Sequence, residues 1–203
     1  MLRERFPAAH VGRADVAAWV VGVSVLDDLA LSRGQVVEVV SAPGSGALLV
    51  HEVLRAGAAA GRLTGLVDGR DSFSPRDATP EALPALVWFR CREATQALRV
   101  ADLLVRDGNL PLVLLDLQFN PARELQRIPR ASWSRLSLLA EKSGTLLLTF
   151  TPQPLVAGAA RRVTLQRPVS PDLLHMARRD LALHLQPAEA RGEKTVVPFR
   201  LAG

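Results

Sequence analysis

The chain has little cysteine and no long apolar segment. Its single cysteine, Cys91, excludes an internal disulfide and a zinc site built on several thiolates. No apolar run approaches the roughly 20 residues that a membrane-spanning helix needs. The first residues, Met1–Arg5, carry an acid and lead into no apolar signal region. These absences predict a cytoplasmic protein that has no membrane partner.

Lysine is also scarce, because arginine supplies almost all of the positive charge. Of 25 basic residues only Lys142 and Lys194 are lysines. Residues 1–120 hold 12 basic and 14 acidic side chains, whereas residues 121–203 hold 13 basic and 6 acidic ones, so the net charge of +5 comes from the second part. An arginine-rich half indicates a surface for nucleic acid or an acidic partner, or an ordinary solvated face.

The length and composition favour one sizeable α/β domain. The chain has 203 residues, of which 48% are hydrophobic and 22% charged. Apolar strand-like segments alternate with segments of helical period, which predicts a mostly parallel, twisted sheet with helices on both faces. The expected strands are Val36–Val40, Leu63–Val67, Leu86–Arg90, Leu112–Leu117, Thr145–Phe150 and Val163–Gln166. The expected helices are Leu49–Ala60, Glu93–Arg106 ending at Gly108, Ser132–Lys142 capped by Ser132 and ending near Gly144, and Pro171–Leu183.

The segment Ser41–Leu48 has the setting of a phosphate-binding loop, between the first strand and the first long helix. In the motif G-x-x-x-x-G-K-[ST], backbone N–H groups cradle phosphates, the lysine reaches their oxygens and the hydroxyl holds Mg²⁺. Here Ser41 stands at the first glycine position, and Gly44 and Gly46 remain within the segment. Ala47 and Leu48 stand at the lysine and hydroxyl positions. We therefore expect a loop that keeps its shape and has lost its catalysis.

The ordered motifs of residues 20–167 resemble the core of the RecA/Rad51 recombinases. Val21–Leu29 is similar to the stretch leading into that ATPase core, and Arg33–Val39 to its first strand. Pro111–Asp116 resembles the strand that ends in the magnesium-binding acid, and Leu146–Phe150 the strand that follows it. The resemblance implies a RecA-like P-loop fold and a domain organisation of three parts. These are an N-terminal segment (1–19), the RecA-like core (20–167) and a C-terminal helix and tail (168–203).

The departures from the family pattern imply that the ATPase is not functional. Besides Ala47 and Leu48, Arg70 stands where the family has its catalytic glutamate, and only Asp116 survives from the magnesium site. One acid without the loop lysine cannot organise Mg²⁺ and a γ-phosphate. Asp116 is then a structural remnant at the edge of the sheet. We expect no enzymatic activity, no cofactor and no metal.

Short RecA-like chains without a working ATPase resemble ImuA, a RecA-related accessory protein of bacterial damage-induced mutagenesis. The resemblance implies an adaptor in the SOS response and translesion synthesis, associated with the nucleoid, with RecA or translesion polymerase components as partners. Two alternatives stay open. One is a cell-division inhibitor similar to SulA, and the other is an ATPase completed by a residue of a partner.

Two further features suggest binding surfaces. Phe6-Pro7-Ala8-Ala9 has the F-x-x-A pattern with which Rad51-type recombinases dock onto a neighbouring protomer. Phe6 and Ala9 are therefore candidates for partner docking or self-association. The alternative is that Phe6 packs on its own domain. Basic residues near the positions of the family's two DNA loops are candidates for single-stranded DNA contact, and Trp133 for stacking on a base. The candidates are Arg123, Arg127, Arg130, Trp133, Arg161 and Arg162. A solvated basic face with a half-buried Trp133 is the alternative.

The sequence offers little for other chemistry. His10, His51, His175 and His184 are scattered and have no metal-ligand spacing, and Cys91 has no histidine near it in sequence. No paired acids suggest acid–base catalysis.

Overall fold

A computed structural model describes residues 19–165, 171–173 and 175–188 of the chain. The strands are β1 (Val36–Val40), β2 (Thr64–Asp68), β3 (Leu86–Arg90), β4 (Leu112–Asp116), β5 (Leu146–Thr151) and β6 (Arg161–Thr164). The α-helices are α2 (Ser24–Asp27), α3 (Pro43–Ala59), α4 (Ala94–Asp107), α5 (Ala122–Leu125), α6 (Arg130–Ser143) and α7 (Arg178–Leu183). Short 3₁₀ helices are η2 (Pro75–Asp77), η3 (Pro80–Ala85) and η4 (Pro171–Leu173).

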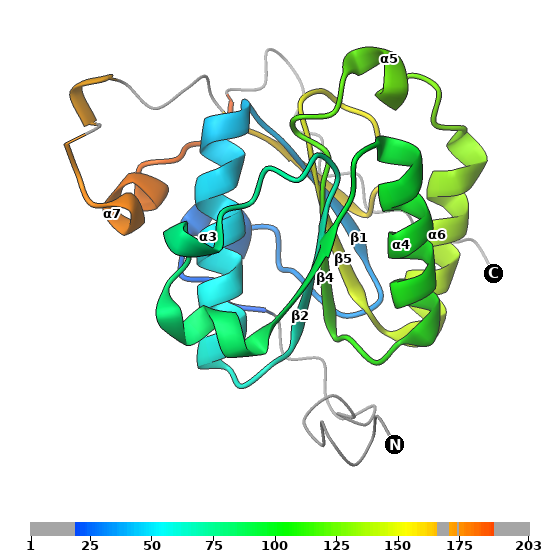
Figure 1. The fold of residues 1–203 in the computed structure, drawn as a ribbon, viewed down its shortest axis with the longest axis horizontal. Coiled ribbons are helices and arrows are strands. Elements are labelled where there is room, and N and C mark those ends of the chain that lie inside the picture. Colours follow the sequence, from blue (N-terminus) through cyan, green and yellow to red (C-terminus); the bar gives the residue numbers. More distant parts are fainter. Residues whose placement is uncertain (1–18, 166–170, 174, 189–203) are drawn as a thin grey trace.

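The six strands form one sheet in the order β3-β2-β4-β5-β1-β6, and each neighbouring pair is parallel. Helix α3, joined by η3 and α7, covers one face of the sheet, and α4 and α6 cover the other (Figure 1). The prediction of a parallel sheet with helices on both faces is confirmed. The predicted strands Val36–Val40 and Leu86–Arg90 have the observed bounds, and the other four are displaced by one or two residues.

The two faces of the sheet bury two apolar clusters, because successive side chains of a strand point to opposite faces. In β1, Val37 and Val39 belong to the cluster that includes α3, and Val36 belongs to the cluster beneath α4 and α6. All five residues of β1 are therefore buried, as expected for a strand covered on both sides.

Helices α4 and α6 both end on a glycine, as the sequence predicts. Gly108 and Gly144 have φ values of 69° and 72°, the left-handed conformation that closes a helix without a Cβ clash. The predicted start of α6 is wrong, because the residue that precedes the helix is Pro129 and not Ser132. The helix begins two residues earlier, at Arg130, and Trp133 and Leu136 lie on its buried face.

The C-terminal segment is not the single amphipathic helix that its spacing predicts. It forms η4 and the six-residue α7, with Ala177 extended between them. Tertiary contacts override the local pattern, because Ala182 and Leu185 join the core cluster beside α3. The C-terminal part thus completes the same core as the sheet.

Candidate functional site

The carboxyl ends of the parallel strands bring several polar side chains to one edge of the sheet. Ser41 directly follows β1, Asp68 ends β2 and Asp116 ends β4. Asp68 and Asp116 are direct partners in the register of β2 and β4. In open α/β sheets ligands bind outside this edge, so it is the candidate site.

The predicted phosphate loop is a helix in the structure, which corrects the expectation that the loop keeps its shape. Ala42 is extended, and α3 begins at Pro43, whose fixed φ suits a first helical turn. The backbone N–H of Gly46 donates to the carbonyl of Ala42 at 3.2 Å. That N–H is consequently engaged within the chain and does not face an open cradle.

The space beside Gly46 is filled by two side chains of the protein itself. A Cβ at this position would lie 1.9 Å from Oε1 of Gln118 and 2.4 Å from Oγ of Ser41. Ser41 Oγ donates to Gln118 Oε1 at 3.2 Å, and both residues are buried. The glycine of the motif therefore accommodates a side-chain amide at close range.

Ala47 and Leu48 border a cavity of about 270 Å³ at the same edge of the sheet. His51 lines it one helical turn further along α3, and Asp116 lines it from β4. Arg178 of α7 lines it from the C-terminal segment. The cavity thus lies where the resemblance places a nucleotide, and among the described residues its basic lining side chains are His51 and Arg178.

Sequence reasoning did not find the contribution of His51 or Arg178. His51 stacks on Phe73, with ring centroids 5.4 Å apart. Burial, helped by the charge of Arg178, holds the pKa of His51 below its usual value. Arg178 is ion-paired to Asp77 at 3.2 Å. Only the fold brings α3, η2 and α7 together, so no spacing in the sequence signals this group.

Asp116 is poised to titrate near neutral pH. Withdrawal from water raises the pKa of its carboxyl to about 6, with a smaller contribution from the charge of Asp68. Hydrogen bonds oppose the shift, because the backbone N–H and the side-chain amide of Gln118 donate to Oδ1 of Asp116 at 3.0 and 2.9 Å.

Asp68 organises the loop that follows β2. Its carboxylate accepts hydrogen bonds from the backbone N–H groups of Arg70, Ser72 and Phe73, at 2.8–3.2 Å. The indole N–H of Trp88 donates to it at 3.4 Å. Asp68 is the register partner of Asp116 on the neighbouring strand, but its acceptor capacity is largely used by its own loop.

One solved structure places this architecture among known proteins. The crystal structure of the RadB recombinase matches with a TM-score of 0.51 and 20% identity, over 81% of this chain and 78% of that chain. Neither a protein-family model nor a curated protein sequence matches. The chain has a RecA-like recombinase fold. At this identity the likeness establishes the fold alone.

The predicted DNA contacts of this RecA-like chain do not form one surface. Trp133 is 1% exposed and belongs to the core beneath α6, so the prediction that it stacks on a base is wrong. Arg123 on α5, Arg127 in the connection between α5 and α6, and Arg130 at the start of α6 are exposed, beyond the carboxyl ends of the strands. They stay candidates for DNA contact.

Arg161 and Arg162 lie elsewhere, because they begin β6 and a parallel strand begins at the opposite edge of the sheet. Arg162 is exposed on one side, but its guanidinium is engaged by the fold. Its guanidinium pairs with the buried Glu38, its register partner on β1, and donates to the carbonyl of Val156 at 2.8 Å. Glu38 also accepts from the Thr151 hydroxyl at 2.9 Å. Arg162 therefore stabilises the sheet.

The remaining predictions concern docking, metals and membranes. Phe6 and Ala9 lie outside the described residues. Among the residues that the structure describes, no group of three or more His, Cys, Asp or Glu side chains could hold a metal ion. Within the same part of the chain, no helix combines the length and apolar character that crossing a bilayer requires.

Proposed function

We propose that this RecA-like chain is a non-catalytic adaptor in bacterial DNA-damage tolerance, similar to ImuA. It acts in the SOS response and translesion synthesis through contacts with RecA or a translesion polymerase, with weak single-stranded DNA binding as a second activity. The fold supports the RecA relationship. The chemistry of the site supports the loss of catalysis.

The main support for the proposal is the set of residues found where a nucleotide would bind. Phosphoryl transfer needs a cation on the phosphates and a hydroxyl on Mg²⁺, and Ala47 and Leu48 supply neither. Gln118 and Ser41 occupy the space beside Gly46, whose N–H is engaged in α3. These residues do not fit a magnesium nucleotide.

The surviving acid also fits poorly with magnesium binding. A hard cation would have to displace the two hydrogen bonds that Oδ1 of Asp116 accepts from the backbone N–H and the side-chain amide of Gln118. The position of Asp116 follows from its place at the carboxyl end of β4 and needs no bound metal to explain it.

Calorimetric titration of the full chain with Mg-ATP and with Mg-ADP tests the loss of nucleotide binding. We expect no measurable heat of binding at nucleotide concentrations well above the micromolar range. Micromolar affinity would instead support the alternative of an ATPase completed by a partner's residue.

A pull-down with the tagged chain from DNA-damaged cells tests the adaptor role. We expect RecA or a translesion polymerase component among the retained proteins, and direct binding with the purified partner. Direct binding to the tubulin-like division protein, without RecA or polymerase, would transfer the assignment to a SulA-like division inhibitor.

A further inference from the structure

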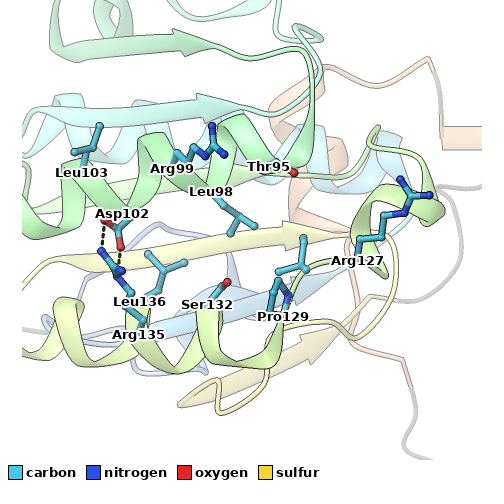
Figure 2. Close-up of a pocket in the computed structure, with 11 residues that line it drawn as sticks. Thr95, Leu98, Arg99, Asp102, Leu103, Arg127, Pro129, Ser132, Arg135 and Leu136 are labelled. Atoms are coloured by element: carbon cyan, nitrogen blue, oxygen red, sulfur yellow. Dashed lines mark hydrogen bonds and ion pairs between the residues drawn. The ribbon is translucent and has the colours of Figure 1, made fainter.

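A groove separate from the strand edge runs between α4 and α6 (Figure 2). Its volume is about 560 Å³, roughly twice that of the cavity beside Ala47. Leu98 of α4 and Leu136 of α6 contribute apolar lining, and Ile128 and Pro129 line it where the chain enters α6. Leu103, at 61% exposure, adds an apolar side chain on α4.

The charged groups around the groove are predominantly basic. Asp102 is the one acidic lining residue in the described part of the chain and is already neutralised, since Arg135 pairs with it at 2.7 Å from α6 and Arg106 pairs with it from α4. The Asp102–Arg135 contact spans the groove in Figure 2. Arg99 and Arg127 also line the groove, and within the described residues neither has a carboxylate partner. An occupant therefore meets an apolar floor and two uncompensated guanidinium groups.

We propose that the groove binds an amphipathic, acidic helix of a partner protein. An apolar stripe with anchors at positions i, i+3 and i+7 would pack between α4 and α6, as helices do in apolar grooves. Carboxylates beside that stripe would pair with Arg99 and Arg127, for which guanidinium groups have suitable donor geometry. The inference deepens the proposed adaptor function and rests on it, because it assigns one partner contact to one surface.

The floor of the groove favours a peptide over nucleic acid. Phosphates could use the same arginines, but Leu98, Ile128 and Leu136 provide no aromatic surface for bases, and Trp133 is buried beneath α6. A second copy of this chain would bring arginine against arginine in a two-fold interface. The chain's own ends complement the groove poorly, because residues 1–18 and 189–203 each carry one more basic than acidic side chain.

Binding of a designed peptide by the full chain tests the inference. The probe is a fluorescein-labelled amphipathic helix of about 15 residues, with leucines at i, i+3 and i+7 flanked by glutamates. The control peptide carries lysines in place of the glutamates. Fluorescence anisotropy gives the affinity of each, and a labelled single-stranded oligothymidine is measured in parallel.

The decisive variant is Arg99→Glu/Arg127→Glu, because both side chains are exposed and the double change leaves the core intact. We expect it to weaken binding of the acidic peptide at least tenfold. The matched control is Arg76→Glu, an exposed arginine on η2 away from the groove, which should leave the affinity unchanged. Leu98→Ala should also weaken binding, with thermal melting used to confirm that the variant is folded.

Three outcomes would overturn the inference. One is equal affinity for the acidic and lysine peptides, or no binding of either. Another is oligothymidine binding that the groove variant removes while the peptide stays unbound, which would assign the surface to nucleic acid. The third is a concentration-dependent dimer in sedimentation that Leu98→Ala abolishes. The Mg-ATP titration is an independent experiment. Nucleotide binding in it would refute the proposed function, and it would not produce any of these three outcomes.

Discussion

Asp116 shows how its surroundings change the behaviour of one residue. In sequence it stands where the resemblance places a magnesium-binding acid, and in the structure its carboxyl is withdrawn from water beside Asp68. Its pKa is raised to about 6, so the folded state binds this proton more tightly than the unfolded state does. The ionised carboxylate therefore costs stability at neutral pH.

Asp116→Asn should stabilise the protein at pH 7.5 by about 2 kcal/mol, since one pKa unit corresponds to about 1.4 kcal/mol and water still reaches part of the site. The asparagine oxygen can still accept from Gln118. The gain should shrink as the pH falls from about 6 toward 4, where the wild-type carboxyl is protonated. Urea unfolding of the wild type and the variant at each pH measures this gain in the free energy of unfolding. Subtracting the two values removes the contribution of His51, whose lowered pKa changes stability with pH in the opposite direction. A less stable variant at pH 7.5 would contradict the account.

Gly46 and Gly44 form a matched pair for testing whether the space beside Gly46 is filled. Both lie in α3, where alanine gains up to about 1 kcal/mol over glycine. A Cβ at Gly44 meets nothing within 4 Å, whereas one at Gly46 overlaps Gln118 and Ser41. Gly44→Ala should be neutral or stabilising, and Gly46→Ala should destabilise by about 2 kcal/mol through overpacking.

Chemical denaturation measures both glycine variants, and Gln118→Ala added to Gly46→Ala should recover part of the loss because the two sites are in contact. Equal effects of the two single changes would show that the space beside Gly46 is open. That result would also weaken the argument against a bound nucleotide.

At the scale of elements, local signals were reliable where they concern covered strands and glycine-terminated helices. The β-branched segment Val36–Val40 favours a strand by its own composition, and all five of its residues are buried. The predicted length of the C-terminal helix was wrong, because that length depends on packing against the rest of the fold. Helix α7 exists where Ala182 and Leu185 meet the core beside α3, whereas Ala177, upstream of the helix, is exposed and extended.

Leu185 and Leu183 test that contact. Leu185 is 5% exposed in the core cluster, whereas Leu183 is 49% exposed on the same segment. Leu185→Ala should destabilise the fold by about 2 kcal/mol, because it removes buried apolar contacts from the core cluster. Leu183→Ala should change stability by less than about 0.5 kcal/mol. Thermal or urea melts compare them, and equal small effects would show that the C-terminal segment is dispensable.

At the scale of the whole molecule, the excess positive charge has three different uses. Arg162 neutralises the buried Glu38, Arg135 and Arg106 hold Asp102, and Arg123, Arg127 and Arg130 remain exposed near the strand ends. A count of charges cannot separate these uses, because each depends on which strand or helix lies opposite.

Arg123→Glu/Arg130→Glu should weaken single-stranded DNA binding and lower the slope of log affinity against log salt by about 1 to 2, since each lost phosphate contact removes about 0.7. Neither residue lines the α4–α6 groove. Anisotropy with labelled oligothymidine over a salt series measures the effect, with Arg76→Glu as the control. A wild-type protein that never binds oligothymidine at low salt would remove DNA contact from the function.

The sequence by itself determined the alternation of strands and helices, the glycine ends of α4 and α6, and the absence of a cation and a hydroxyl at Ala47 and Leu48. These properties are local, because they follow from residue identity and short-range spacing. The tertiary structure alone decided that α3 begins at Pro43, that Gln118 fills the space beside Gly46, that Trp133 is core, and that arginines line a groove between α4 and α6. Each of these depends on contacts between segments far apart in the chain, and those contacts exist only once the sheet has brought the segments together.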